Sequence, residues 1–125
     1  YMGLVFEKIC SDYLTAQNAN ANLPFLFTSI GRWWGTNPQT HNQVEIDLIA
    51  NDGKDYLICE CKWRNEKTDL SVLNELKENA DIFNKKRDNT WFVLFTKVGF
   101  TDAVLKEAEA DPNIILVDMN KIMDI

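Results

Sequence analysis

The chain has 125 residues, of which 46% are hydrophobic and 26% are charged, a composition expected for one soluble globular domain. Its 13 basic and 19 acidic side chains give a net charge of −6, which argues against tight unaided binding to nucleic acid, because phosphate contacts need positive charge. No apolar run approaches the ~20 residues of a membrane span, so no membrane partner is expected. Three cysteines without the spacing of a disulfide framework favour a reduced, cytoplasmic protein.

The first two predicted elements are an amphipathic helix and an aromatic strand. Apolar residues recur near the helical period from residue 3 to about residue 18. The predicted stripe consists of Leu4, Val5, Ile9, Tyr13 and Leu14, with Phe6 and Cys10 beside it. Residues 25–34 are rich in aromatic and β-branched side chains and predict a strand. His41 lies in the polar loop that follows, and we expect it to be solvated rather than to act as a base.

A hairpin and a second helix come next. Residues 44–50 and 55–63 are predicted strands, joined by a tight turn whose Asp-Gly pair suits positive φ. A helix follows, from a cap at Thr68 or Asp69 to about residue 86, with a regular apolar stripe.

The last third of the chain alternates strand and helix. The basic run 85–87 would lie in the last turn of the preceding helix, where positive charge complements the helix dipole. Residues 90–97 form an apolar strand, Thr101 caps a helix to about residue 110, and residues 114–117 form a short strand.

The predicted order of elements is therefore α-β-β-β-α-β-α-β. The first three strands have short connections and should form an antiparallel meander, whereas the crossover helix makes the third and fourth strands parallel. This pattern predicts an α/β fold with helices on both faces of a mixed sheet, in three α/β/α layers within a single domain.

Charged residues interrupt the two apolar strands of the hairpin. Asp47 lies in one strand, and Glu60 and Lys62 lie in the other. An unpaired buried charge is costly, so such residues persist in a sheet when they are paired or bind a metal. Glu60 and Lys62 face the same way because side chains alternate along a strand, and Cys59 and Cys61 must point to the opposite face as buried free thiols. Two acids and a lysine are suited to a divalent metal and a phosphodiester.

This pattern resembles the PD-(D/E)xK nuclease superfamily, whose fold is called restriction-endonuclease-like. Asp47 matches the acid of the second strand, Glu60-Cys61-Lys62 matches the E-x-K of the third, and Glu7 matches a glutamate found on the first helix of many members. The segments Gly3–Glu7, Arg32–Trp34, Glu45–Ala50 and Glu60–Trp63 also resemble the C-terminal domain of archaeal and bacterial P-loop ATPases. The resemblance implies a domain taken from a longer ATPase chain. No Walker motif is present in this part.

The resemblance implies metal-dependent hydrolysis of phosphodiester bonds in DNA or RNA. Asp47, Glu60 and the carbonyl of Cys61 would hold Mg²⁺ or Mn²⁺, and Lys62 would orient water or stabilise the charge of the transition state. Glu7 would hold a metal-bound water or a second ion. Glu45 is expected on the face of Asp47, so it could join the acids or lie at their rim.

Two alternatives remain open at this level. The acids and the lysine could form a structural ion-pair network, and the domain could be an inactive nuclease fold that serves as an interaction or regulatory module of the ATPase. Nucleic acid and the rest of the ATPase chain are the expected partners, with weak binding of nucleic acid by the isolated domain. Arg64 and Lys67 directly follow the E-x-K and are well placed to meet a phosphate. The four tryptophans are expected mainly in packing rather than in base stacking. The sequence does not determine the substrate or the oligomeric state.

Overall fold

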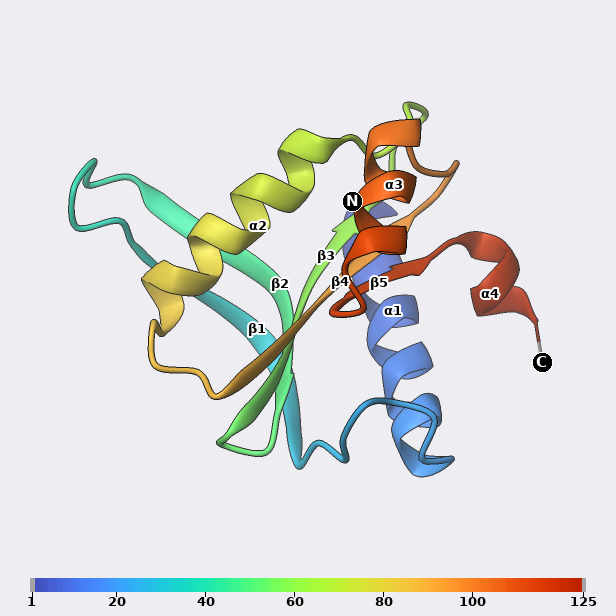
Figure 1. Ribbon diagram of the computed structural model, residues 1–125, viewed down its shortest axis with the longest axis horizontal. Helices are drawn as coiled ribbons and strands as arrows, with labels where there is room; N and C mark the ends of the chain where they lie inside the picture. Colours follow the sequence, from blue (N-terminus) through green and yellow to red (C-terminus); the bar gives the residue numbers. More distant parts are fainter. Residues whose placement is uncertain (1, 125) are drawn as a thin grey trace.

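The computed structural model describes residues 2–124, which form one five-stranded sheet with four helices (Figure 1). In chain order the elements are α1 (Met2–Ala19), β1 (Ser29–Thr36), β2 (Gln43–Asn51), β3 (Asp55–Lys62), α2 (Leu70–Phe83), β4 (Asn89–Thr96), α3 (Asp102–Ala110), β5 (Ile114–Val117) and α4 (Met119–Met123). The mixed α/β class predicted from the sequence is confirmed. The short α4 was not predicted.

The sheet has the strand order β1-β2-β3-β4-β5. The first three strands are antiparallel neighbours, and β3, β4 and β5 run parallel. Short connections favour antiparallel pairing, and the helical connections return the chain to the same end of the sheet. The carboxyl ends of β3 and β4 therefore lie at one edge of the molecule.

The core has two parts, one on each face of the sheet. Side chains of α2 and α3 pack on one face around Ile58 and Leu94. Side chains of α1 and α4 pack on the other face, around Leu57 and Phe95. No helix of residues 2–124 combines the length and the apolar character needed to cross a bilayer.

The buried side of α1 differs from the predicted stripe. Phe6, Cys10 and Leu14 are buried, whereas Leu4 is 61% exposed and Val5 is 45% exposed. The prediction placed the buried face of the helix too far toward Leu4 and Val5, because these two residues fit the helical period as well as their neighbours do. The observed phase matters for the site, because Glu7 follows the buried Phe6 and is held close to the sheet.

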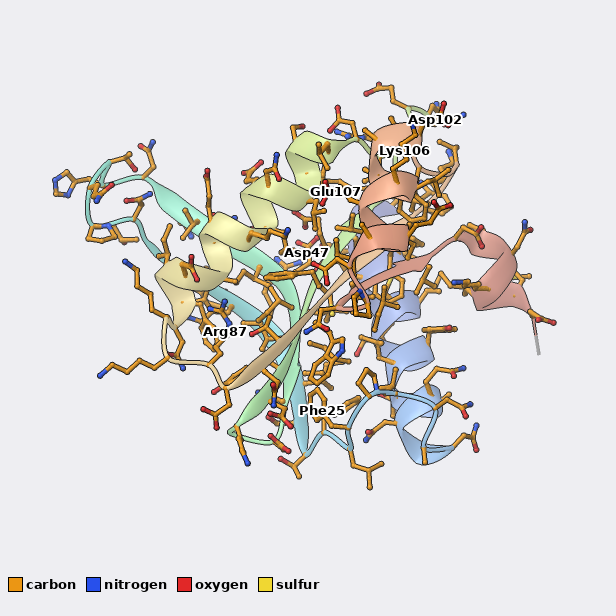
Figure 2. All side chains as sticks on the ribbon, in the orientation of Figure 1. Phe25, Asp47, Arg87, Asp102, Lys106 and Glu107 are labelled. Atoms are coloured by element: carbon orange, nitrogen blue, oxygen red, sulfur yellow. The ribbon has the colours of Figure 1, made fainter. Side chains whose placement is uncertain are left out.

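Two other boundaries need correction. β1 begins at Ser29 rather than at residue 25, since Phe25 and Phe27 pack against the α1 face of the sheet from a loop. α2 ends at Phe83, with Asn84 already extended at φ −167°, so the basic run 85–87 lies beyond the last turn. Arg87 (labelled in Figure 2) nevertheless caps the C-terminal end of α2, because its Nη1 donates a hydrogen bond to the carbonyl of Ala80 at 2.6 Å.

The caps of the later helices follow partly from sequence. The Thr101 side chain accepts a hydrogen bond from the Val104 N–H and caps α3 as predicted. Asp69 occupies the cap position of α2 but makes no capping hydrogen bond with its side chain, which instead accepts from the Ser71 hydroxyl at 2.5 Å.

Candidate active site

A β-bulge in β2 opens the sheet where the predicted acids lie. Gly31 pairs with Ile49 and Trp33 pairs with Ile46, so two residues of β2 lie opposite the single residue Arg32. Ile46 and Ile49 consequently both contribute to the core beneath α2, although three positions separate them. Asp47 belongs to the bulge, and bulges commonly re-aim a side chain next to a functional site.

The ladder between β2 and β3 ends at this bulge. The last pair is Leu48 with Cys59. Beyond it, the side chain of Asp47 enters the gap, and its Oδ2 accepts a hydrogen bond from the Cys61 N–H at 2.9 Å. The carboxylate thus replaces the backbone acceptor that a continued ladder would supply, and Asp47 is fixed at the mouth of the opening between the strands.

Glu60 lies directly beside Asp47 and titrates abnormally. Its side chain is 16% exposed. Burial, followed by a side-chain hydrogen bond with Asp47 and by the negative charge of Asp47, raises the pKa of Glu60 to about 9, and Lys62 opposes this only in part. At neutral pH the carboxyl group of Glu60 therefore keeps its proton.

Lys62 completes the predicted group. Its Nζ lies 3.9 Å from Oε2 of Glu60, at the long end of an ion-pair distance, and its side chain is 33% exposed. The lysine therefore meets the acids from the solvent side. Asp47, Glu60 and Lys62 come together as the sequence predicted, at the carboxyl end of β3.

Glu7 and Arg32 close the side of the site that faces α1. They form an ion pair between α1 and the bulge position of β1. The hydrogen bond that Arg32 donates to the Glu7 carboxylate raises the pKa of Arg32. The charges of Glu7, Glu45 and Asp47 act in the same direction, whereas burial acts against them. Arg32 therefore offsets part of the negative charge gathered here. Its place in the site was not predicted, because the bulge that puts it opposite Asp47 leaves no pattern in the sequence.

The predicted residues Glu7, Asp47, Glu60 and Lys62 border a cavity of about 330 Å³. It is lined by Glu7, Gln43, Val44, Glu45, Asp47, Glu60, Cys61, Lys62, Glu75 and Asn79. Glu45 is exposed and lies at the rim, and its backbone carbonyl accepts from the Asn79 amide at 3.4 Å. Glu75 and Asn79 come from α2 and were not predicted, since polar residues on the exposed side of a helix carry no signal of a nearby site.

A divalent cation fits this donor set in a limited way. Among residues 2–124 no group of three or more His, Cys, Asp or Glu side chains is arranged to hold a metal ion. Mg²⁺ usually takes one or two carboxylates and completes its shell with water and phosphate oxygens. Asp47 and Glu60 can supply two carboxylates once Glu60 loses its proton. These two carboxylates would hold the ion, together with the backbone carbonyl of Cys61, which the resemblance implies as a further oxygen ligand.

The cysteines lie on the opposite face, as predicted. Cys59 is buried, Cys61 is half-buried, and both are unbonded, as is Cys10. Burial raises the pKa of the Cys59 thiol, and a hydrogen bond with Cys10 together with burial raises that of Cys61. These thiols therefore pack in the core between α1 and the sheet, and Cys61 also borders the cavity.

The remaining sequence candidates lie outside this cavity. His41 is exposed in a loop with φ 61°, as expected of a solvated residue. Three tryptophans pack against aromatic rings, Trp33 on Phe83 at 5.4 Å among them. Trp34 is the exception, with 61% of its surface exposed.

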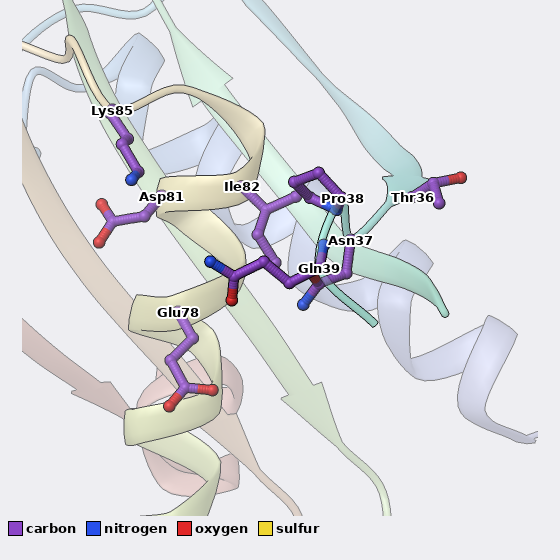
Figure 3. Close-up of a pocket in the computed structure, with 8 residues that line it drawn as sticks. All are labelled: Thr36, Asn37, Pro38, Gln39, Glu78, Asp81, Ile82 and Lys85. Atoms are coloured by element: carbon purple, nitrogen blue, oxygen red, sulfur yellow. Dashed lines mark hydrogen bonds between the residues drawn. The ribbon is translucent and has the colours of Figure 1, made fainter. Parts of the chain in front are cut away.

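A larger hollow of about 690 Å³ lies between the β1–β2 loop and α2 (Figure 3). Its charged lining consists of Glu78, Asp81 and Lys85, all exposed on the surface of α2 or just beyond it. It lacks a buried titratable group, so the smaller cavity is the better candidate for chemistry.

Comparisons with known proteins place the chain among uncharacterised relatives. The model of DUF234, described as archaea bacterial proteins of unknown function, matches residues 1–91. The uncharacterised protein MJECL04 of Methanocaldococcus jannaschii is 40% identical over 89 residues, which make up 70% of this chain and 18% of that protein. The chain thus spans less than a fifth of this relative.

A solved structure shares the fold. The crystal structure of AF1548, a protein of unknown function, covers 93% of this chain and 65% of its own, with a TM-score of 0.56 and 17% identity. At this identity the likeness concerns the fold alone.

Proposed function

The chain belongs to the DUF234 family of archaeal and bacterial proteins, and we propose that it hydrolyses phosphodiester bonds of DNA or RNA with the help of a divalent metal ion. The observation that carries the proposal is the carboxyl pair at the splayed end of β2 and β3. Burial and the neighbouring Asp47 raise the pKa of Glu60 there, and Lys62 Nζ lies 3.9 Å from Oε2 of Glu60. A carboxyl group whose pKa is raised by burial and by a neighbouring acid is typical of functional sites.

The proposed roles follow from the positions of the side chains. Asp47 and Glu60 hold Mg²⁺ or Mn²⁺, with the carbonyl of Cys61 as a further oxygen ligand. The bound ion supplies Lewis acidity and lowers the pKa of a water molecule. Lys62, on the solvent side of the acids, orients that water and stabilises negative charge that develops on the phosphoryl oxygens.

Glu7 and Arg32 are proposed to shape the approach to the acids. The ion pair holds Glu7 at the cavity wall, where its carboxylate can accept a hydrogen bond from water. Arg32 reduces the repulsion among the acids, because its positive charge interacts with Glu7, Glu45 and Asp47. The protein can thus keep the carboxylates close together without unfolding this corner.

The fold supports this proposal at a general level. A mixed five-stranded sheet with the acids on β2 and β3 is compatible with the PD-(D/E)xK resemblance. The larger size of the Methanocaldococcus relative leaves room for further domains, and we propose a P-loop ATPase as the partner within that longer chain.

A cleavage assay tests the proposal. The protein is incubated with labelled single-stranded and duplex DNA and RNA in Mg²⁺, in Mn²⁺ and in chelator. Cleavage should require the metal and should fall about 100-fold or more in Asp47→Asn and in Lys62→Met, since each removes a charge from the reacting centre. Glu78→Gln is the matched control, because Glu78 is an exposed acid of α2 outside the cavity. Cleavage that persists in Asp47→Asn would reject the site.

An interaction module is the second candidate. Trp34 is 61% exposed on the edge strand β1, and Leu4 is 61% exposed on α1, so the domain presents exposed apolar side chains that another protein or domain could cover. In that case the acids are structural, and no substrate of the panel would be cut with either metal.

A further inference from the structure

Two loops meet at the carboxyl ends of β3 and β4, next to the cavity. The Lys97 N–H donates to the Lys62 carbonyl at 3.0 Å. The Thr68 N–H donates to the Gly99 carbonyl at 2.9 Å, and the Thr68 hydroxyl donates to the buried hydroxyl of Thr96 at 3.0 Å. These bonds join the β3–α2 loop to the β4–α3 loop and hold both loops at the end of β3, the strand that carries Glu60.

This part of the molecule is basic, although the chain carries a net charge of −6. We define the basic edge as Lys62, Arg64, Lys67 and Lys97. The acids among residues 62–69 and 96–101 are Glu66 and Asp69, and both are exposed. The other positive charges of the basic edge therefore lie near Lys62, which also lines the cavity.

Arg64 is the unusual member of the basic edge. Its Nε is buried and has no hydrogen-bond partner, and the guanidinium forms no ion pair with any residue from 2 to 124. The two other arginines of the chain are paired, Arg32 with Glu7 and Arg87 with Asp81. A buried donor without a partner is rare in folded proteins, and a bound water or ion is one of the explanations for such a donor.

Lys97 is held in a defined position at the same edge. Its Nζ donates to Oδ1 of Asn65 at 2.8 Å and lies 4.8 Å from the centre of the Trp63 ring. An ammonium group fixed in this way loses little further freedom when it meets an anion. The positioned ammonium group of Lys97 and the unpaired guanidinium of Arg64 thus lie on neighbouring loops.

We propose that the basic edge binds the phosphodiester backbone of a nucleic-acid strand, with Arg64 bound to a phosphate adjacent to the one at Asp47 and Glu60. The inference rests on the proposed function and specifies where the strand lies. Guanidinium groups match phosphate oxygens with two parallel hydrogen bonds. The cations lie on two loops rather than around one point, which suits a chain of phosphates better than a single phosphate ion.

Binding of a fluorescent single-stranded oligonucleotide in chelator and low salt tests this assignment without any cleavage. Arg64→Gln should weaken binding about tenfold and should reduce the steepness of the salt dependence by about 0.7 in log–log slope, as expected for one lost phosphate contact. Lys54→Gln is the matched control, since Lys54 is exposed in the turn at the opposite end of β3. Arg64→Lys should recover part of the affinity, because it restores the charge but not the planar fork.

Three results would overturn the assignment: no change in Arg64→Gln, an equal loss in Lys54→Gln, or displacement of the strand by inorganic phosphate more strongly than by sulfate at equal ionic strength. A thermal melt of each variant checks that folding is retained. The test is independent of hydrolysis, because it contains no metal. Binding that depends on Arg64 without any cleavage would reject the proposed reaction and keep the strand-binding edge, and metal-dependent cleavage without a role for Arg64 would do the reverse.

Discussion

At the scale of single residues, the proton held by Glu60 links the stability of the protein to pH. The pKa of Glu60 is raised to about 9 in the folded chain from an ordinary value of 4.5. Below pH 4.5 the residue is protonated in both the folded and the unfolded state and has no net effect. Between these values only the unfolded state loses the proton, so the free energy of unfolding falls as pH rises.

Glu60→Gln should abolish this fall. The variant lacks the titrating group, so its free energy of unfolding in metal-free buffer should change less between pH 5 and pH 9 than that of the parent, by on the order of a few kcal/mol. Urea unfolding at several pH values measures the difference. Glu78→Gln, which changes an exposed acid, should follow the parent; parallel curves for all three proteins would show that Glu60 titrates normally.

The same residues show how far sequence reasoning reaches. Asp47, Glu60 and Lys62 were predicted to lie together because charged residues in apolar strands need partners, and alternation along a strand fixes their face. Arg32 and Glu75 were missed as members of the site. Their positions depend on a bulge and on the rotation of α2 over the sheet, and neither is encoded in the local spacing of residues.

At the scale of elements, the joined loops after β3 and β4 support the carboxyl end of the sheet. Thr68 is fully buried between them and pairs with Phe100 in an isolated bridge. Its hydroxyl donates to Thr96, whose own hydroxyl donates to the Gly99 carbonyl at 2.9 Å. This chain of hydrogen bonds holds the loop that carries Arg64.

Thr68→Val should therefore destabilise the protein by about 1 kcal/mol, because it removes one buried hydrogen bond while keeping the shape of the side chain. Chemical denaturation measures the loss. Thr36→Val is a suitable comparison, as Thr36 is exposed at the end of β1 and should change stability little. If Thr68→Val were as stable as the parent, the loops would be held by their backbone bonds alone.

Element boundaries were predicted less well than element types. α1 was expected to bury Leu4 and Val5. The face that packs against the sheet is instead the adjacent one, which carries Phe6. The predicted end of α2 was three residues too late, because Lys85 and Lys86 are good helix formers and only the departure of Asn84 from helical geometry ends the helix. The fold class needed only hydrophobic periodicity and the order of elements, which is why it could be predicted.

At the scale of the whole molecule, the two halves of the core separate packing from chemistry. Cys10 of α1 and Cys59 of β3 are buried between α1 and the sheet, and Cys61 is half-buried beside them, on the face opposite the acids. A native-state reaction with a thiol reagent should label Cys10 and Cys59 slowly, since burial protects them and the Cys59 pKa is raised. Denaturant should make all three react quickly. Rapid labelling of Cys59 in native buffer would contradict the packing of this face.

The charge of the whole chain limits its affinity for nucleic acid. With a net charge of −6, the isolated domain should bind weakly at physiological salt, and binding at low salt should fall steeply as salt increases. Anisotropy titrations over a range of salt concentrations measure this. Tight binding at physiological salt without metal or partner would mean that the basic edge outweighs the repulsion from the rest of the molecule.

Thermal melting with and without Mn²⁺ tests the central claim most directly, namely that Asp47 and Glu60 form a metal site rather than a structural ion-pair network. A ligand at 100 times its Kd stabilises the folded state by about 2.7 kcal/mol. The melting temperature of the parent should therefore rise by several degrees in Mn²⁺. Asp47→Asn and Glu60→Gln should lose this rise and melt no lower than the parent in metal-free buffer. Glu60→Gln removes the buried acid that is held protonated, and Asp47→Asn removes the charge that helps to raise its pKa. The account would be contradicted if the parent showed no shift with Mn²⁺ while both variants melted far lower than the parent in chelator.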